Sequence, residues 1–129
     1  MKFTIKLAPV TKKNSQQILI NKKTGRPFVT PSKKFKEYQE SCGWFMPKLK
    51  KPIDCKINIK ATYYMPTWRK VDITNLHSAL HDVLVHYGVI ADDNMTIVLS
   101  TDGSRVRYDK QNPRTEIEIT KKEEMTGFE

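Results

Sequence analysis

Apolar and polar residues alternate along three segments of the chain, at 3–7, 55–64 and 115–120. Such alternation predicts β-strands that bury one face. A shorter apolar run at 95–99 and the alternating segment at 105–108 are typical of one or two further strands. Together these segments predict a mixed sheet in which most neighbouring strands run antiparallel.

Two other segments carry apolar residues at the period of a helix that packs on a core. The first is predicted to begin at Thr30 and Pro31, as N-cap and first helical residue, and to end near Met46. The second begins at or just after Asp72, and Gly88 is expected to end it in the left-handed conformation. The periodic positions of the second helix are Leu76, Ala79, Leu80, Val83, Leu84 and Tyr87.

Between the first strand and the first helix, residues 18–20 and 27–29 flank the sequence Asn-Lys-Lys-Thr-Gly. This pattern predicts a β-hairpin in which Gly25 takes a positive φ. The chain contains no repeat, linker or low-complexity block. Its 129 residues therefore predict one α+β domain over 1–129, with two helices packed on the sheet and a frayed tail at 122–129.

Charge is distributed unevenly along the chain, whose net charge is +9. Residues 1–70 contain 17 Lys and Arg against 3 Asp and Glu, whereas residues 71–129 contain 6 against 11. The basic half predicts a surface that binds a polyanion, although surplus lysine also serves solubility. The candidate phosphate-binding residues are Lys12, Lys13, Lys33, Lys34, Lys36, Arg69, Arg105, Arg107 and Lys110.

Acidic residues gather around the second predicted helix, with Asp72 before it, Asp82 within it and Asp92–Asp93 after its exit turn. Clustered carboxylates hold Mg²⁺ or Mn²⁺, and such an ion offsets phosphate charge in nucleases. To meet Asp72, Asp92–Asp93 must return along the helix over roughly 20 Å, which a strand antiparallel to the helix would achieve. Each residue also has a simpler interpretation: a helix cap, a solvated helix edge and a turn.

Histidine and tryptophan offer further candidates. His77 and His81 have the spacing of a zinc pair, but Ser78 follows His77 where a metalloprotease motif has Glu. We therefore interpret both histidines as surface or core-edge residues. Trp68 lies in a loop beside Arg69 and Lys70, where it fits either stacking on an unpaired base or covering the core.

Cysteine content and hydropathy bear on the cellular compartment. Cys42 and Cys55 form neither a disulfide framework nor a zinc knuckle, which fits a reducing cytoplasm. The first residues are too polar for a signal peptide, and no apolar run is long enough to span a membrane. We expect a cytoplasmic protein with no membrane partner.

One stretch resembles a known family. It reads Trp68-Arg-Lys-Val-Asp-Ile-Thr-Asn-Leu, then Ala79-Leu-x-Asp-Val-Leu, then Gly88-Val-Ile-x-Asp-Asp-Asn. It resembles the RusA family of Holliday-junction resolvases, which shows a basic loop, Asp-x-Asp-Asn-Leu, a helix with Ala-x-x-Asp-Ala-Leu, and Gly-x-x-x-Asp-Asp. The resemblance is good over residues 66–98 and weaker at the first and last strands.

The resemblance implies an endodeoxyribonuclease of bacteria, phages or prophages that needs Mg²⁺ and cuts four-way DNA junctions as a homodimer in recombination and repair. It makes Asp72 and Asp93 catalytic, with Asp92 as neighbour, and Asn75 and Asp82 match positions that recur in the family. The residues alone leave two alternatives: a nucleic-acid-binding protein without catalysis, and a metal nuclease specific for flaps or other branched DNA.

The chain departs from the family pattern at two positions. Thr74 stands where the family has its second catalytic aspartate, and Ser78 where it has a lysine. We expect Asp82 or Asp92 to replace the missing carboxylate, with Thr74 supplying a hydroxyl or a bound water. Candidates for the missing positive charge are Lys70, Arg69 and Lys110.

Overall fold

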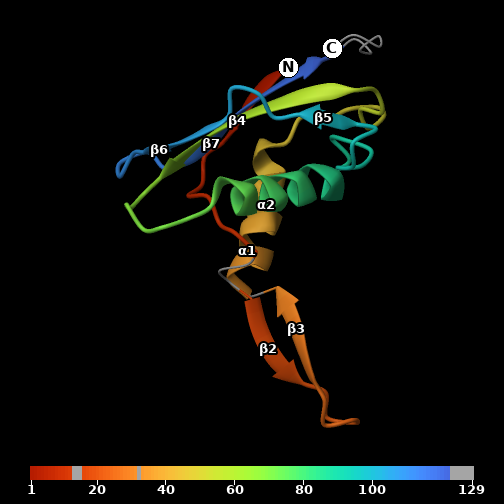
Figure 1. Ribbon diagram of the computed structural model, residues 1–129, viewed down its shortest axis with the longest axis vertical. Helices are drawn as coiled ribbons and strands as arrows, with labels where there is room; N and C mark the ends of the chain where they lie inside the picture. Colours follow the sequence, from red (N-terminus) through yellow and green to blue (C-terminus); the bar gives the residue numbers. More distant parts are fainter. Residues whose placement is uncertain (13–15, 32, 123–129) are drawn as a thin grey trace.

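A computed structural model describes residues 1–12, 16–31 and 33–122. Five strands form one sheet, α1 and α2 cover one of its faces, and the β2–β3 hairpin projects away from this body (Figure 1). The predicted α+β class is confirmed. The elements are β1 (Lys2–Ile5), β2 (Gln16–Ile20), β3 (Pro27–Pro31), α1 (Lys33–Cys42), the 3₁₀ helix η2 (Gly43–Phe45), β4 (Ile57–Met65), α2 (Ile73–His86), β5 (Val98–Ser100), β6 (Arg105–Tyr108) and β7 (Arg114–Lys121).

Strand β4 is the centre of the sheet. It pairs antiparallel with β7, which in turn pairs antiparallel with β1. On its other side β4 pairs parallel with two short strands: β5 beside its beginning, where Ile57 faces Val98, and β6 beside its end, where Met65 faces Tyr108. The segment before β5 therefore lies near the beginning of β4, whereas the loop that leaves β4 lies near β6.

The core lies between the sheet and the two helices. Residues 57, 59, 61 and 63 of β4 are buried, as the alternating pattern predicts. The five core-facing positions of α2 from Leu76 to Leu84 are buried as well, which confirms the helical period. From α1, the buried residues are Phe35, Tyr38 and Cys42.

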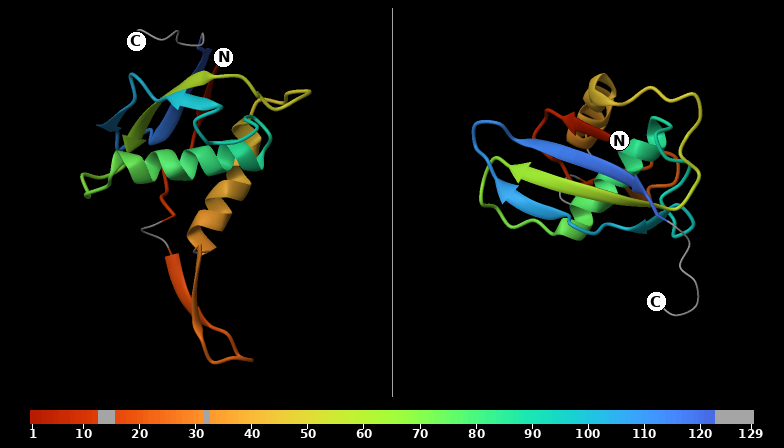
Figure 2. Two further views of the ribbon diagram at one scale, coloured as in Figure 1. Left: turned by 45° about the vertical axis from the view of Figure 1, so that its right-hand side comes forward. Right: turned by 90° about the horizontal axis from the view of Figure 1, so that it is seen from above.

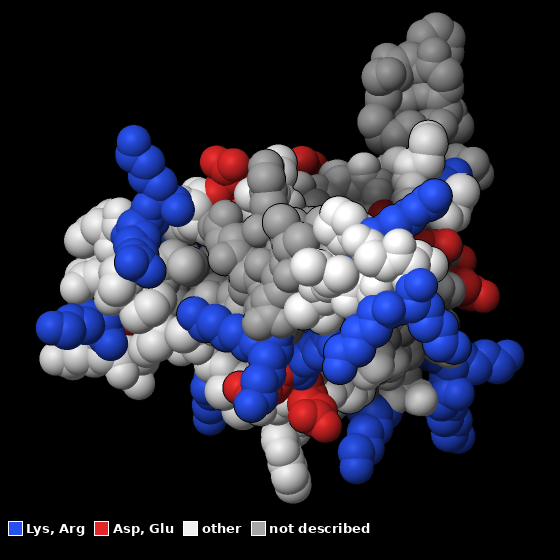
Figure 3. Space-filling view, turned by 90° about the horizontal axis from the view of Figure 1, so that it is seen from below, with Lys and Arg blue, Asp and Glu red and all other residues white. Residues whose placement is uncertain are grey.

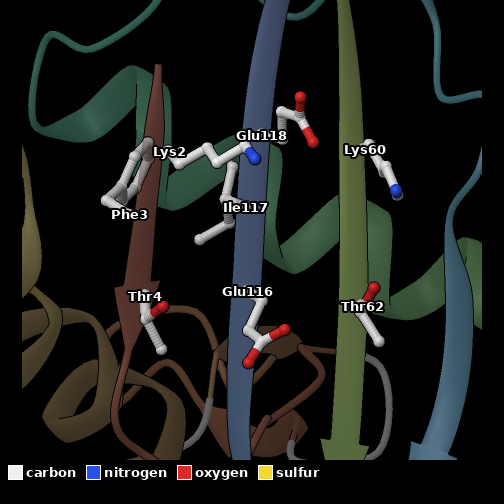
Figure 4. Close-up of a pocket in the computed structure, with 8 residues that line it drawn as sticks. All are labelled: Lys2, Phe3, Thr4, Lys60, Thr62, Glu116, Ile117 and Glu118. Carbon is white, nitrogen blue, oxygen red and sulfur yellow. The ribbon is translucent and has the colours of Figure 1, made fainter.

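The opposite face of the sheet is open and polar (Figures 2 and 4). Register places Lys2, Glu118 and Lys60 in one row across β1, β7 and β4. A hollow of about 400 Å³ lies there. Because Glu118 lies between two lysines in this row, the next row is also polar, and no predicted site residue lines the hollow, we interpret it as the solvated side of the sheet.

Two predicted boundaries are wrong. Thr30 and Pro31 belong to β3, where Pro31 pairs with Gln16, so α1 begins only at Lys33. Strand pairing prevails here over a local helix-start signal. Lys122 donates its backbone N–H to the carbonyl of Lys56 at 2.8 Å, so the predicted frayed tail does not begin at 122. The rest of that tail lies outside the described residues.

The turn of the β2–β3 hairpin and the end of α2 agree with the sequence, because a glycine determines each of them. Gly25 and Gly88 have the predicted positive φ, at 70° and 68°. α1 gives way to η2 at Gly43, where a Cβ would come within 3.0 Å of the Tyr87 ring, so this contact requires glycine.

Within the described ranges, no helix is both long and apolar enough to cross a membrane.

Candidate active site and nucleic-acid interface

Asp72 occupies the N-cap position of α2, but its carboxylate does not serve as a cap. Its carbonyl oxygen accepts hydrogen bonds from the backbone N–H groups of Asn75 and Leu76, at 3.0 and 3.2 Å. Its exposed carboxylate makes no capping hydrogen bond to any described backbone group. A helix cap therefore does not account for this side chain, which faces solvent at the first turn of α2 beside the exposed Thr74.

The loop before Asp72 presents an aromatic ring among cations. Trp68 is 81 % exposed and stacks on Tyr108 of β6, with ring centroids 4.7 Å apart and planes 21° apart. Trp68 therefore does not cover the core. Arg105 and Arg107, which the sequence marks as phosphate-binding candidates, are exposed on the same strand as Tyr108. Tyr108 itself was missed, although it ends the alternating Arg-Val-Arg-Tyr segment.

A groove of about 360 Å³ connects this loop to the beginning of α1. It is lined by residues 8–11, Lys34, residues 65–67 and residues 69–71. Two of the predicted phosphate-binding side chains, Lys34 and Arg69, thus meet here with Lys70, a candidate for the missing positive charge. None of the described residues that line it is acidic, and its wall at Val71 adjoins Asp72. Among its described lining residues, the groove therefore has three basic ones and no acidic one, and Asp72 directly follows the last lining residue in the chain.

Lys12 and Asp82 interact with each other. The Lys12 ammonium forms an ion pair with the Asp82 carboxylate, and both side chains are about one third exposed. The same ammonium lies 6.0 Å from the centroid of the Phe35 ring. A cation that binds Asp82 must therefore compete with Lys12, although a pair this exposed is a weak one. Lys13 lies outside the described residues.

The other predicted cations are solvent-exposed. Lys33 and Lys36 lie on α1, where Lys33 approaches Glu37 at 3.8 Å, and Lys110 follows β6. A solvated pair at this distance adds little stability. These side chains therefore remain accessible to a ligand.

Asp92 and Asp93 form the acidic turn that precedes β5. The backbone N–H of Asp93 donates to Asp92 Oδ1 at 2.7 Å, and Asn94 Oδ1 accepts from the backbone N–H of Thr96 at 2.9 Å. Partial burial first, then the hydrogen bond with Asp92 and the negative charges of Asp82 and Asp92, raise the pKa of Asp93. Asp82, Asp92 and Asp93 are thus electrostatic neighbours, and we call these three residues the acidic cluster.

The raised pKa of Asp93 gives a direct test of this coupling. Asp92→Asn is expected to lower the pKa of Asp93 toward its ordinary value, because a hydrogen-bonded like charge is removed. The free energy of unfolding at neutral pH should rise slightly, since a carboxyl whose pKa is raised in the folded state destabilises the fold as pH rises through that pKa. An NMR pH titration of the Asp93 carboxyl measures the shift. Asp102→Asn is the control, and an unmoved Asp93 pKa in Asp92→Asn would show that the coupling is absent.

Asp72 precedes the first residue of α2, whereas Asp92–Asp93 follow its last residue and Asp82 lies within its second half. Asp72 follows the end of β4, whereas Asp92–Asp93 precede β5, which pairs with the beginning of β4. The ten residues from Asp72 to Asp82 alone span roughly 15 Å of helix. Among residues 1–12, 16–31 and 33–122, no three His, Cys, Asp or Glu side chains form a group that could hold one metal ion.

The expected return path of the chain exists, but it carries other residues. β5 and β6 both run parallel to β4, and therefore back toward the Asp72 end of α2. Asp92–Asp93 come before this path and stay at its start. The part of this path that lies toward Asp72 is β6, which carries Arg105, Arg107 and Tyr108.

The histidines of α2 are part of the packing. Nδ1 of His77 lies 2.6 Å from the hydroxyl oxygen of Tyr63, and the rings of His77 and His81 stack with centroids 5.7 Å apart. Burial, with a smaller effect from His77, lowers the pKa of His81 to about 4, although the negative charge of Asp82 acts in the opposite direction. Both side chains are half-buried, in keeping with the core-edge interpretation.

An α+β domain with a cationic groove, an exposed aromatic pair and acidic residues at both ends of one helix has the features of a nuclease that acts on phosphodiesters. The family model for the endodeoxyribonuclease RusA matches residues 7–120 of the 129-residue chain. The chain belongs to this family, whose members are endodeoxyribonucleases that resolve Holliday junctions. The match includes both ends of α2, the groove and the hairpin. No curated protein matches the chain.

Proposed function

We propose that this RusA-family chain is a Mg²⁺-dependent, structure-selective endonuclease that cuts four-way DNA junctions in recombination and repair, and that Mn²⁺ can replace Mg²⁺. The observation that carries the proposal is the cationic groove with Lys34, Arg69 and Lys70, which ends beside the uncapped carboxylate of Asp72. Phosphates bind to cations along such a groove, and the carboxylate then lies at the phosphodiester to be cut.

The donor atoms of the two acidic regions suit a hard cation. Carboxylate oxygens are the ligands that Mg²⁺ prefers. Burial raises the pKa of Asp93 most, and the negative charges of Asp82 and Asp92, whose repulsion a cation would relieve, raise it further. Asp72 and the acidic cluster would hold the ion. When bound, it offsets charge that develops on the phosphate during hydrolysis.

The basic side chains act on the DNA itself. Arg69 and Lys70 hold the non-bridging oxygens of the phosphate while water attacks phosphorus and the bond to the leaving oxygen breaks. Trp68 and Tyr108 form a stacking platform for a base that is unpaired at the branch point. These side chains would therefore position the DNA at the Asp72 end of α2.

The enzyme acts as a two-fold dimer whose active sites each combine residues of both protomers. The separation of Asp72 from the acidic cluster within one chain supports this arrangement. A two-fold axis beside α2 and perpendicular to it would set the two helices antiparallel, so that Asp72 of each protomer faces the acidic cluster of its partner. The dimer then has two sites, as two opposed cuts in a junction require.

A panel of labelled four-way, flap, nicked and linear DNA tests this function. We expect paired cuts in the four-way junction with Mg²⁺ or Mn²⁺, and none with a chelator. Preferred cleavage of flaps would identify a branched-DNA nuclease of other specificity. Binding without any cleavage in either metal would identify a nucleic-acid-binding protein without catalysis.

The two departures from the family pattern are expected to reflect a rearranged site, in which Asp82 has taken over the role of the carboxylate missing at Thr74. Asp82→Asn should then reduce cleavage nearly as much as Asp72→Asn, because Asp82 belongs to the acidic cluster. Thr74→Asp and Ser78→Lys should slow cleavage by crowding the site. Cleavage rates over a Mg²⁺ titration measure all three effects.

Asp54→Asn removes an exposed carboxylate elsewhere and is the control. Unchanged cleavage in Asp82→Asn, together with a lower Mg²⁺ requirement in Thr74→Asp, would show instead that the site lacks one ligand.

A further inference from the structure

The β2–β3 hairpin stands apart from the rest of the molecule (Figures 1 and 2). Its strands pair in register from Gln16 with Pro31 to Ile20 with Pro27, and within the described residues they pair only with each other. Two five-residue strands extend roughly 15 Å, so the tip lies well outside the domain. An isolated hairpin contributes little to folding, which points to a role in binding.

Charge is concentrated at the tip of this hairpin. Residues 16–20 and 27–31 contain no charged side chain, whereas Lys22, Lys23 and Arg26 lie in the connecting turn and are all exposed. Three cations therefore occupy a stretch of five residues at the point farthest from the domain. No acidic residue accompanies them in the turn.

The backbone of the turn is held by its own hydrogen bonds. Asn21 donates its N–H to the carbonyl of Arg26 at 2.9 Å and accepts from Gly25 N–H at 2.7 Å. The Asn21 side-chain oxygen accepts from the N–H groups of Lys23 and Thr24, at 2.9 and 3.3 Å. Gly25 adopts the φ of 70° that this turn requires. A turn that is already ordered loses little conformational entropy when its cations bind a ligand.

The cationic tip is continuous with the basic surface of the domain. Residues 1–36 contain no Asp or Glu, and α1 begins at the base of the hairpin with Lys33 and Lys34. Lys34 also lines the groove that leads to Asp72. Viewed from the hairpin side, Lys and Arg side chains are spread across this face (Figure 3). A polyanion that occupies the groove is therefore within reach of the hairpin.

We propose that the β2–β3 hairpin is a DNA-binding arm whose tip, through Lys22, Lys23 and Arg26, contacts the phosphate backbone of a duplex arm away from the cut site. The proposal rests on branched DNA as the substrate, but not on the metal chemistry. A duplex presents phosphates along its whole length, so a second contact adds affinity without touching the reacting phosphate. A second protomer is a poorer partner, because two tips of like charge repel each other.

The test compares two triple variants of the full chain that remove the same charge. Lys22→Ala/Lys23→Ala/Arg26→Ala alters the tip but keeps Asn21 and Gly25, which hold the turn. Lys48→Ala/Lys50→Ala/Lys51→Ala removes three exposed cations beyond the other end of α1 and is the matched control. A third variant, Lys22→Arg/Lys23→Arg/Arg26→Lys, retains the charge of the tip.

Affinity for a labelled four-way junction is measured without metal between about 50 and 200 mM salt. In the tip variant, the slope of log K against log salt should become shallower by up to roughly 2.7 for each protomer whose tip binds, and affinity near 0.1 M salt should fall on the order of a hundredfold or more. The control variant should change the slope by less than about one, and the charge-retaining variant should match the wild type.

Three results would overturn the proposal: a wild-type slope in the tip variant, an equal loss in the control variant, or a change in sedimentation mass with unchanged DNA affinity, which would assign the hairpin to protomer contacts. A wild-type chain that binds no DNA overturns it as well. A failure of the proposed function would look different. A protein that binds junctions through the tip but never cuts them would contradict the proposed nuclease activity and still support the DNA-binding arm.

Discussion

Asp93→Asn is expected to abolish junction cleavage while junction binding stays the same or tightens. The cleavage rate should fall by about a thousandfold or more, the scale of losing a group that stabilises charge in the transition state. Binding should survive because Asp93 lies among like charges that repel phosphate; burial first, and then these neighbours, raise its pKa. Asp72→Asn should behave in the same way. Its stability should barely change, because the Asp72 carboxylate makes no capping hydrogen bond to the described backbone and Asn is an equally good N-cap residue.

Single-turnover cleavage and equilibrium binding, measured on the same labelled junction, separate these effects. Asp54→Asn serves as the control for removal of an exposed carboxylate. Full activity in both Asp72→Asn and Asp93→Asn would eliminate the proposed metal site. If cleavage and binding were lost together along with a lower melting temperature, the residues would be structural.

Periodicity predicted those parts of the fold that one buried face determines. β4, β7 and α2 each place alternate or helically spaced apolar residues on the core, so local sequence carries their structure. The hairpin was also predictable, because its turn chemistry is local. The beginning of α1 was not: Thr30 and Pro31 carry a helix-start signal, but pairing of Pro31 with Gln16 places them in a strand. That pairing joins residues outside the window of a local pattern.

The candidate site could likewise be predicted from the sequence only in part. Sequence identified the acidic residues around α2, and the family match now covers all of them. The sequence did not determine how these acidic residues are arranged in space. Helical spacing gives the distance from Asp72 to Asp82, but it does not show that β5, which follows Asp92–Asp93, pairs with the beginning of β4. The Lys12–Asp82 pair joins residues 70 positions apart, and no local pattern predicts such a contact. The stacking of Trp68 on Tyr108 is equally non-local.

Protomers that are inactive on their own are expected to regain nicking when they are combined. If each active site takes Asp72 from one protomer and Asp93 from its partner, an Asp72→Asn protomer paired with an Asp93→Asn protomer has one intact site. The other site carries both substitutions. Such heterodimers should nick one strand of a junction at up to the wild-type rate per site, but should not resolve it by paired cuts.

A reciprocal control makes this test decisive. Wild-type protomers paired with Asp72→Asn/Asp93→Asn protomers should be inactive, because each of the two composite sites then lacks one carboxylate. Sites built within single chains predict the reverse, with nicking by the wild-type/double pair and none by the pair of single variants. Heterodimers purified through two different affinity tags and assayed for nicking of labelled junctions distinguish the two arrangements. Activity confined to the wild-type/double pair would place Asp72 and Asp93 of one chain in the same site, and the separation across α2 would then have to close when DNA binds.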